Sequence, residues 1–350
     1  MTQLTHGGDW AGYRAQYGHD ALDFSANVSP LGLPQGVANA IAAALPHADR
    51  YPDPLCRALR AKLAPHEGIP AESILCGNGA ADLIFRLAWA AKPRTALVTA
   101  PTFAEYAAAL ESAGCAMRRH FLQAEVDFAV TDSILSSITP EVDMVFLCQP
   151  NNPTGQLTPL PLVERILRRC EACGALLVVD ECFLDFLPDC NALTAKALLD
   201  SKNLLILKAF TKLYGMAGVR LGYCLCANTA LLEAMQAAGQ PWAVSSLAQA
   251  AGLAALDETA YVAQVRALIA QQRPRLTAGL RALGLRVLDG RANYLLFQGP
   301  ETLGDALRQR SVVLRSCSNY PGLDGSWYRT AVRTGPENDE LLKTLAEVLA

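Results

Sequence analysis

The chain has 350 residues, of which 51% are hydrophobic and 18% charged, and its formal net charge is −3 at pH 7. A chain of this length can bury a large core and predicts two domains. The slightly acidic balance argues against nucleic acid as a partner, which favours a basic face, and no stretch reaches the roughly 18 unbroken apolar residues of a membrane span.

The N-terminus and the cysteines indicate the cellular compartment. Residues 1–8 lack the basic and apolar regions of a signal peptide, so we expect a cytoplasmic protein. The 11 cysteines are then expected to be reduced and buried as small apolar residues. Cys170 and Cys173 form a CxxC pair, for which a zinc site or a redox dithiol is the alternative. No second Cys/His pair stands at a zinc-like interval, so we predict no metal site.

Short apolar runs alternate with helical patterns through the middle of the sequence. Fully buried strands are predicted at Ala96–Thr99, Met144–Cys148, Leu176–Asp180 and Leu204–Lys208. Helices are predicted between them at Ala80–Trp89, Ala104–Ala113 and Pro161–Cys173. This alternation implies an α/β fold, with a mainly parallel sheet covered by helices on both faces. Leu221–Cys226 follows the preceding strand too closely for a crossover helix, so we expect it to be antiparallel.

The last third of the chain changes character. A long helix is predicted at about Glu258–Leu283, interrupted at Pro274. Short strands follow at Leu285–Leu288, Tyr294–Phe297, Val312–Leu314 and Tyr328–Arg333, and a helix at Asn338–Leu349 closes the chain. We therefore expect a large domain over residues 36–245 and a smaller α+β domain over residues 246–350. Residues 1–35, rich in Gly, Pro and Asn, fit neither pattern and are expected to run along the surface to the small domain and the active site.

Polar residues at strand ends are the candidates for function, because ligands bind at the carboxyl ends of the strands in open α/β sheets. Gly77-Asn78-Gly79-Ala80-Ala81-Asp82 follows a short strand and opens a helix, whose free N–H groups can bind phosphate. A plain tight turn is an equally good interpretation of this motif alone. A dinucleotide-binding turn is disfavoured, because Asp82 stands where that motif has its third glycine.

Three later strand ends also carry polar residues. Asn152 lies in Pro150–Gly155, which by itself could be an ordinary turn. Asp180 ends an apolar strand, where a carboxylate is costly unless it is paired or binds a ligand. Lys212 stands beside glycine-rich turns and could be either a solvated charge or a nucleophilic amine.

The order of these motifs carries more information than any one of them. A glycine turn, Asn-Pro-Thr-Gly, a strand-end Asp and Thr-Lys with an arginine eight positions on resembles the fold-type I aminotransferases over nearly the whole chain. The resemblance implies an aminotransferase fold, whose large domain has a seven-stranded sheet, and pyridoxal phosphate as the cofactor. Lys212 would be catalytic and carry the cofactor as a Schiff base. Asp180 would keep the pyridine nitrogen protonated, so that the ring can accept electrons.

The resemblance also implies the other contacts to the cofactor. Asn152 would donate to the ring oxygen, and Phe103 would stack on the ring. The cofactor phosphate would be held by Gly79, Ala80, Thr211 and Arg220. Tyr51 matches a tyrosine that reaches this phosphate from the partner subunit, which implies a homodimer with shared active sites.

Four features resemble the threonine-phosphate decarboxylases of this family more than the histidinol-phosphate aminotransferases. The opening segment His6-Gly7-Gly8 resembles one that contributes to the substrate phosphate site, and the loop from Asp23 to Gly32 resembles the decarboxylase version. Phe183 stands where the aminotransferases have tyrosine. The segment from Arg315 to Leu323 matches the decarboxylase pattern.

The implied substrate is a small phosphorylated amino acid, L-threonine O-3-phosphate, decarboxylated to (R)-1-aminopropan-2-yl phosphate for the aminopropanol arm of cobalamin. Its two anionic groups would be bound among His6, Gly7, Asn27, Asn152, Arg315 and Arg329. Arg329 matches the family's carboxylate-binding arginine, and Arg333 is expected to be an exposed strand charge unless a second anion must be bound. Which of His6, Arg315, Arg329 and Arg333 binds the carboxylate and which the phosphate stays open.

Other functions remain as alternatives. The nearest is a histidinol-phosphate aminotransferase, which would consume 2-oxoglutarate. L-Serine O-phosphate is a competing substrate, because one methyl group contributes only about 1–3 kcal/mol of discrimination. A transcription regulator with an aminotransferase-like domain is disfavoured, because no basic helix-turn-helix pattern precedes the catalytic-like region.

Overall fold

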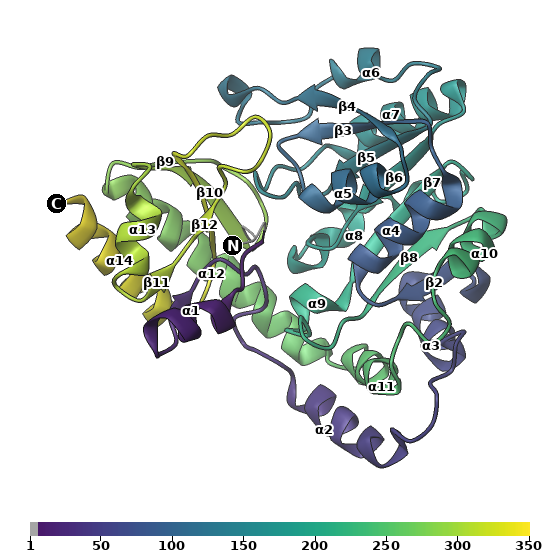
Figure 1. The fold of residues 1–350 in the computed structure, drawn as a ribbon, viewed down its shortest axis with the longest axis horizontal. Helices are drawn as coiled ribbons and strands as arrows, with labels where there is room; N and C mark the ends of the chain where they lie inside the picture. Colours follow the sequence, from purple (N-terminus) through teal and green to yellow (C-terminus); the bar gives the residue numbers. More distant parts are fainter. Residues whose placement is uncertain (1–5) are drawn as a thin grey trace.

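A seven-stranded sheet is the centre of the fold in the computed structural model, which describes residues 6–350 (Figure 1). Its strands lie in the order β2-β8-β7-β6-β5-β3-β4. β8 is antiparallel to both neighbours, and all other neighbouring strands are parallel. The bounds are β2 (Ile74–Gly77), β3 (Thr95–Ala100), β4 (Ala116–Phe121), β5 (Met144–Cys148), β6 (Leu176–Asp180), β7 (Leu204–Ala209) and β8 (Gly222–Cys226). The predicted α/β class, the four buried strands and the antiparallel strand are confirmed.

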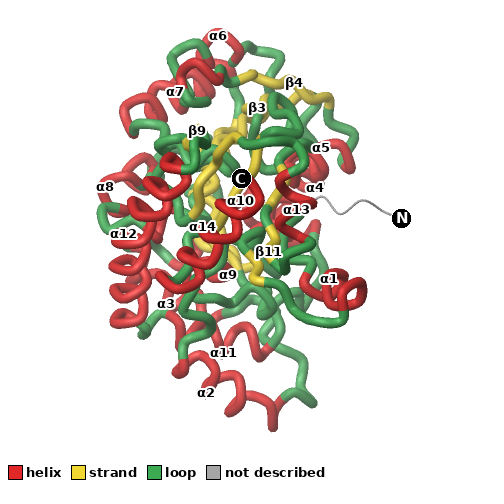
Figure 2. The backbone as a smooth tube through the Cα atoms, turned by 90° about the vertical axis from the view of Figure 1, so that its left-hand side faces the viewer, coloured by secondary structure: helices red, strands yellow, loops and turns green. Residues whose placement is uncertain are grey.

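Helices cover both faces of this sheet, because its strands are apolar on both sides. α4 (Ala80–Ala91), α5 (Ala104–Ser112) and α10 (Thr229–Ala238) pack on one face, around Val178 and Leu205. α3 (Arg57–Glu67), α7 (Leu160–Cys173) and α11 (Ser246–Ala255) pack on the other, around Val179 and Ile206. α2 (Gln35–Ala44) lies against α11 at the lower edge of both views (Figures 1 and 2).

A second apolar core lies beside the sheet, formed by the C-terminal third of the chain (Figure 1). Its antiparallel sheet has the order β12-β13-β10-β9. The strands are β9 (Arg286–Val287), β10 (Tyr294–Gln298), β12 (Arg315–Ser316) and β13 (Trp327–Ala331). The helices are α12 (Thr259–Ala282), α13 (Leu303–Arg308) and α14 (Gly335–Leu349). Leu276, Phe297 and Leu341 are among the side chains that meet in this core.

The interruption predicted at Pro274 is wrong. Thr259–Ala282 is one continuous helix with Pro274 inside it, although a proline removes one backbone hydrogen bond there. Ile269, Leu276 and Leu280, on both sides of the proline, are buried in the second core. Tertiary packing of this face therefore outweighs the local cost of the proline.

The N-terminal segment contains one helix and one short strand, which no pattern in the sequence had indicated. α1 (Trp10–Tyr17) begins at Asp9, whose carboxylate accepts a hydrogen bond from the Gly12 N–H at 3.0 Å. β1 (Leu22–Asp23) then pairs in parallel with β11 (Val312–Val313), which ties the N-terminal segment to the second core. The sequence alone does not reveal β1, because this strand has only two residues and pairs with a strand nearly 300 residues away.

Short elements complete the described chain. They are α6 (Ile134–Ser137), α8 (Cys190–Leu193) and α9 (Phe210–Leu213), with 3₁₀ turns at Leu45–His47, Ala71–Ser73, Ala124–Val126, Leu184–Phe186 and Ala195–Leu198. Among residues 6–350, no helix combines the length and apolarity needed to cross a bilayer. The same residues contain no group of three or more His, Cys, Asp or Glu side chains arranged to hold a metal ion.

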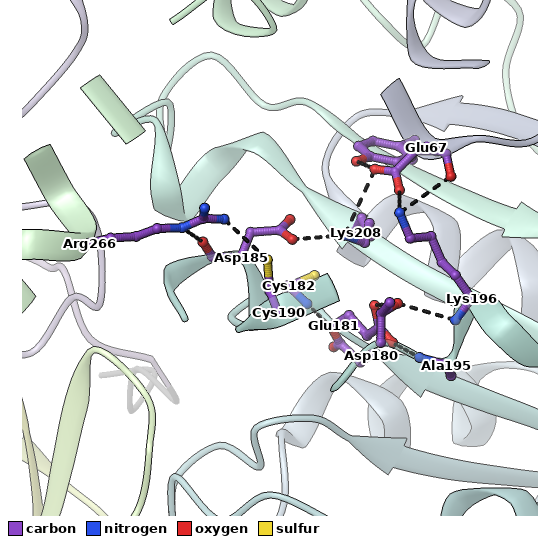
Figure 3. A network of polar contacts seen from close by, with 12 residues as sticks. Glu67, Asp180, Glu181, Cys182, Asp185, Cys190, Ala195, Lys196, Lys208 and Arg266 are labelled. Atoms are coloured by element: carbon purple, nitrogen blue, oxygen red, sulfur yellow. Dashed lines mark hydrogen bonds and ion pairs between the residues drawn. The ribbon is translucent and has the colours of Figure 1, made fainter. Parts of the chain in front are cut away.

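A buried network of charges joins β7 to the elements around it (Figure 3). The Lys208 ammonium lies 2.9 Å from Asp185 and 3.8 Å from Glu67, and Lys196 lies 2.8 Å from Glu67. Tyr223 donates to Glu67 at 2.5 Å. Burial alone would raise the pKa of Glu67, but Lys208 and the other donors outweigh it and lower that pKa. The network therefore holds Glu67 as an anion in the core.

Loss of Lys208 should destabilise the protein strongly. Lys208→Ala leaves Glu67 and Asp185 without their shared cation, and removing one partner of a buried ion pair costs about 3–5 kcal/mol. Urea unfolding of the apoprotein measures the change. Lys202→Ala, at an exposed lysine just before the same strand, should stay within about 0.5 kcal/mol of the wild type. A Lys208→Ala protein as stable as Lys202→Ala would show that the network contributes nothing.

Candidate active site

The carboxyl ends of β5, β6 and β7 open into a cavity of about 730 Å³ between the two cores. Asn152 follows β5, Asp180 ends β6, and Lys212 lies in α9 just after β7. Because these strands are parallel and adjacent, their ends lie at one edge of the sheet, and all three side chains line the cavity.

Lys212 is the amine of the cavity. Its Nζ lies 5.7 Å above the Phe183 ring, and among residues 6–350 it makes no hydrogen bond or ion pair. Burial, and then the positive charge of Arg329, lower the pKa of Lys212 to about 8. About a tenth of such amines are uncharged at pH 7, compared with fewer than one in a thousand for an ordinary lysine. The site thus supplies a nucleophilic amine.

Asp180 lies opposite, with only 5% of its surface exposed. Its Oδ1 accepts from the Cys182 N–H at 3.0 Å, and its Oδ2 accepts from the Tyr106 hydroxyl at 2.6 Å. Each carboxylate oxygen therefore has one protein donor, which fixes the orientation of the carboxylate at the cavity wall.

A cradle for an anion lies at the start of α4. Gly79 has a φ of +82°, and a Cβ there would come within 2.6 Å of the Arg220 guanidinium. A Cβ on Gly222 would lie 2.7 Å from the Ala80 nitrogen, so both glycines are needed for the close approach of these backbones. The first N–H groups of a helix have no partners within it, and together with Arg220 they suit a phosphate. Ala80, Thr211 and Arg220 line the cavity, and Gly79 lies just behind Arg220.

Asn152 and Arg329 hold each other in place. Arg329 donates to Asn152 Oδ1 at 2.5 Å and to the Ser25 carbonyl at 2.8 Å, and its guanidinium lies 5.5 Å over the Tyr294 ring. Because the amide oxygen of Asn152 is occupied, its NH₂ group is the part that can donate to a ligand. Phe103, at the start of α5, forms another wall of the cavity.

Polar groups without partners gather on the remaining side of the cavity. Within residues 6–350, neither polar atom of the Asn27 side chain has a hydrogen bond, nor does Nε of Arg329, although both residues are buried. Buried polar groups are normally paired, so these atoms point to a ligand. Arg315 lines the same side, with its guanidinium 5.4 Å over the Tyr320 ring.

The N-terminal segment closes this side of the cavity. His6 Nε2 lies 2.7 Å from Glu105, and the Gly8 N–H donates to Ser25 Oγ at 2.8 Å. A Cβ on Gly7 would lie 2.3 Å from the Ser25 carbonyl oxygen, so only glycine allows the segment to lie so close. His6 and Gly7 thus line the cavity together with the strand-end residues.

Two side chains singled out from the sequence, Tyr51 and Arg333, lie outside the cavity. Tyr51 is 80% exposed and stacks on Trp242 with ring centroids 4.5 Å apart, away from the cavity of its own chain. Arg333 is half-buried rather than exposed, because it pairs with Glu337 at the start of α14 and donates to the Asp23 carbonyl at 3.1 Å. The interpretation of Arg333 as an exposed charge is therefore wrong in its detail, although Arg333 does not reach the cavity.

Sequence reasoning missed two residues that shape the site. Tyr106 lies behind Asp180, and its spacing of three from Phe103 on a predicted helix was the available signal. Asn151 braces the turn that presents Asn152, because it accepts from Thr102 at 2.8 Å and donates to Thr154 at 2.9 Å. No local pattern distinguishes its role from that of Asn152.

The arrangement fits the cofactor that the sequence predicts. A pyridoxal phosphate needs an uncharged amine, a carboxylate for its ring nitrogen, a donor for its ring oxygen and a cradle for its phosphate. Lys212, Asp180, Asn152 and the Gly79–Arg220 cradle supply these groups around one cavity.

Comparisons with known proteins agree with this fold. A family model described as aminotransferase class I and II matches residues 19–346. A threonine-phosphate decarboxylase of Salmonella typhimurium is 40% identical over 332 residues, covering 94% of this chain and 91% of that protein. A histidinol-phosphate aminotransferase of Desulfitobacterium hafniense is 34% identical, with 94% and 92% covered.

Solved structures show the same fold. The histidinol-phosphate aminotransferase of Clostridium acetobutylicum matches with a TM-score of 0.88 and 27% identity, covering 93% of this chain and 98% of that one. The Sinorhizobium meliloti histidinol-phosphate aminotransferase, solved in complex with pyridoxal-5'-phosphate, matches with a TM-score of 0.86 and 24% identity, covering 99% and 95%.

The low pKa of Lys212 predicts how the apoprotein takes up its cofactor. Because only the uncharged amine reacts, covalent attachment of pyridoxal phosphate should become faster with rising pH, with a midpoint near 8. Stopped-flow absorbance measures the rate. Arg329→Gln removes a nearby positive charge and should move the midpoint upward, whereas Arg333→Gln, at a guanidinium paired with Glu337, should not. A wild-type midpoint near the ordinary lysine value of about 10.4 contradicts this account.

Proposed function

Because this chain belongs to the class I and II aminotransferase family, we propose that it decarboxylates L-threonine O-3-phosphate to (R)-1-aminopropan-2-yl phosphate and CO₂. Its cofactor is pyridoxal phosphate. The aminopropanol arm of cobalamin is the proposed destination of the product. The similarity to a named threonine-phosphate decarboxylase, at 40% identity over 94% of the chain, supports this choice.

The observation that carries the proposal is that the cavity beside Lys212 has more anion-binding side chains than the cofactor phosphate needs. Arg220 and the start of α4 suffice for the cofactor phosphate, yet Arg315, Arg329, His6 and Asn27 also line the cavity. A phosphoamino acid brings a phosphate of about −1.5 to −2 charge and a carboxylate, which need this many donors at the same time. The unpartnered atoms of Asn27 and Arg329 are suited to receive them.

We assign the following roles to the chain's own residues. Arg329 holds the substrate carboxylate from the side of Asn152, and His6, Arg315 and Asn27 hold the phosphate. When bound, pyridoxal phosphate supplies an electron sink for whichever bond at the substrate Cα is aligned with it. The choice of reaction then depends on how the anion-binding side chains orient the substrate. Lys212, as the amine bordering the cavity, returns a proton to Cα after CO₂ leaves.

The alternative activity is transfer of the amino group of histidinol phosphate. The 34% identity to an aminotransferase of that name favours it. Phe183 disfavours it, because this ring packs against Tyr294 at 5.0 Å and offers no hydroxyl to the cofactor's ring oxygen. Asn152 is then the one strand-end donor for that oxygen in our assignment.

We propose that the active unit is a homodimer, with Tyr51 of each subunit completing the phosphate site of its partner. Tyr51 and Trp242 form an exposed aromatic pair, 80% and 45% exposed, and Leu55, four residues after Tyr51, is exposed as well. Exposed apolar patches of this kind mark association surfaces.

One assay distinguishes the two activities. The purified protein with pyridoxal phosphate and L-threonine O-3-phosphate should release one CO₂ per amine formed, and 2-oxoglutarate should not change the rate. L-Serine O-phosphate, one methyl smaller, should react with a kcat/KM roughly 10–200-fold lower. Dominant amino-group transfer to 2-oxoglutarate without CO₂ would falsify the decarboxylase proposal.

Lys212→Ala provides the control for the assay. It should abolish turnover while the circular dichroism spectrum stays that of the wild type, because the Lys212 side chain makes no hydrogen bond or ion pair within residues 6–350 that the fold could lose. A substantially active Lys212→Ala protein would mean that another amine does the chemistry.

A further inference from the structure

We propose that Val28 selects a phosphoamino acid that carries a methyl group on Cβ over one that does not. This inference deepens the proposed function and rests on it. Among residues 6–350, Val28 is the one valine, leucine, isoleucine or methionine that lines the cavity beside Lys212. The side chains that we assign to the substrate anions are charged or polar, and they bind groups that threonine phosphate and serine phosphate share.

The loop that carries Val28 is held on both sides of it. The Ser25 carbonyl accepts from Arg329 at 2.8 Å, and the Ser29 N–H donates to the Lys212 carbonyl at 2.9 Å. These two bonds lie only four residues apart, so the backbone between them has little freedom to move. The position of the Val28 side chain is therefore set before the substrate arrives.

Burial along this loop places Val28 at the cavity wall. Asn27 and Ser29 are buried, whereas Ala26 and Val28 are half-buried. Ala26 and Val28 both line the cavity. Ala26 lies next to the N-terminal segment, with its Cβ 3.5 Å from where a Cβ on Gly8 would stand. Val28 is the next of the two half-buried side chains along the loop, toward the catalytic amine.

Val28 stands between the groups that we assign to the two ends of the substrate. The side chain of its neighbour Asn27 has no hydrogen bond in the described chain, and we assign it to the phosphate. Its other neighbour, Ser29, is bonded to the main chain of Lys212, to which we assign the proton at Cα. Cβ is the one carbon between Cα and the phosphate ester oxygen. The side chain between these anchors therefore lies beside Cβ, where threonine phosphate has its methyl group.

The aromatic rings of the cavity have other neighbours. Phe103 is the proposed stacking ring of the cofactor, and Phe183 lies 5.7 Å below the catalytic amine. Tyr320 is covered by an arginine guanidinium at 5.4 Å, and Trp10 is 62% exposed on α1. An aliphatic contact favours a methyl group directly, because both surfaces leave water and gain dispersion without needing a polar partner. The valine of the loop supplies this contact.

The test measures CO₂ release by the holoenzyme from L-threonine O-3-phosphate and from L-serine O-phosphate, in the wild type and in Val28→Ala. The wild type should prefer the threonine compound. In Val28→Ala the ratio of the two kcat/KM values should fall roughly 10-fold, the lower end of what one methyl group contributes in an apolar site. Serine phosphate, which has no methyl group to lose the contact, should change by less than about twofold.

The configuration at Cβ gives a second comparison. L-allo-Threonine O-phosphate has its methyl group where threonine phosphate has hydrogen, so with both anions held this methyl group points away from Val28. Val28→Ala should therefore change its kcat/KM by less than about twofold. Calorimetric titration repeats the comparison without turnover. Val28→Ala should weaken the binding of (R)-1-aminopropan-2-yl phosphate but not that of 2-aminoethyl phosphate, which lacks the methyl group.

Two further variants separate recognition from stability. Val348→Ala truncates a half-buried valine of α14 that packs against the second core, and it should leave the ratio of the two kcat/KM values unchanged. Val28→Thr keeps the branched shape and replaces one methyl group with a hydroxyl. It should lower the ratio in the same direction, which keeps the test decisive if Val28→Ala folds poorly.

The outcomes distinguish this inference from the function on which it rests. A Val28→Ala holoenzyme with the wild-type ratio overturns the role of Val28 alone. An equal loss on both phosphoamino acids, or a wild type that shows no preference between them, does the same. A wild type that releases no CO₂ from either compound overturns the proposed function together with this inference.

Discussion

The parallel pairing of β5, β6 and β7 is the constraint on which the site depends. Parallel neighbours bring their carboxyl ends to one edge, so residues that are far apart in the chain, Asn152, Asp180 and Lys212, meet around one cavity. The antiparallel β8 then returns beside β7, so that Gly222 can lie against the start of α4. One sheet edge thereby carries an amine, a carboxylate and an anion cradle.

Burial of these groups explains both their chemistry and their need for support. Desolvation, together with Arg329, lowers the pKa of Lys212 and so makes the amine available near neutral pH. The same desolvation would make Asp180 costly, and its two donors, Tyr106 and the Cys182 N–H, compensate for it. On the opposite face of the sheet, Lys208 binds Glu67 and Asp185 and anchors the strand that leads to Lys212. Lys208 and Lys212 lie only four residues apart, but Lys208 is paired with carboxylates whereas the Lys212 side chain has no ion-pair partner within residues 6–350.

Much of this arrangement could be predicted from the sequence, and the exceptions have physical causes. The buried strands were predictable because an apolar run such as Leu204–Leu207 is typical of a strand that is buried on both faces of a sheet. The edge strand β4 was not, because Ala116–Phe121 is mostly exposed and polar. The predicted interruption of the helix at Pro274 was wrong, because the tertiary packing of α12 outweighs the low helix propensity of proline. The cavity residues were found through the family's motif order, whereas Tyr106 was missed because it acts on a residue of the motif rather than on a ligand.

The central claim is that Lys212 forms the covalent bond to pyridoxal phosphate in this cavity. Reduction of the loaded protein with borohydride makes that bond permanent, and peptide mapping by mass spectrometry then locates the label. The account predicts one label per chain, on the peptide that contains Lys212. A label on a different lysine, or no label at all, would contradict it.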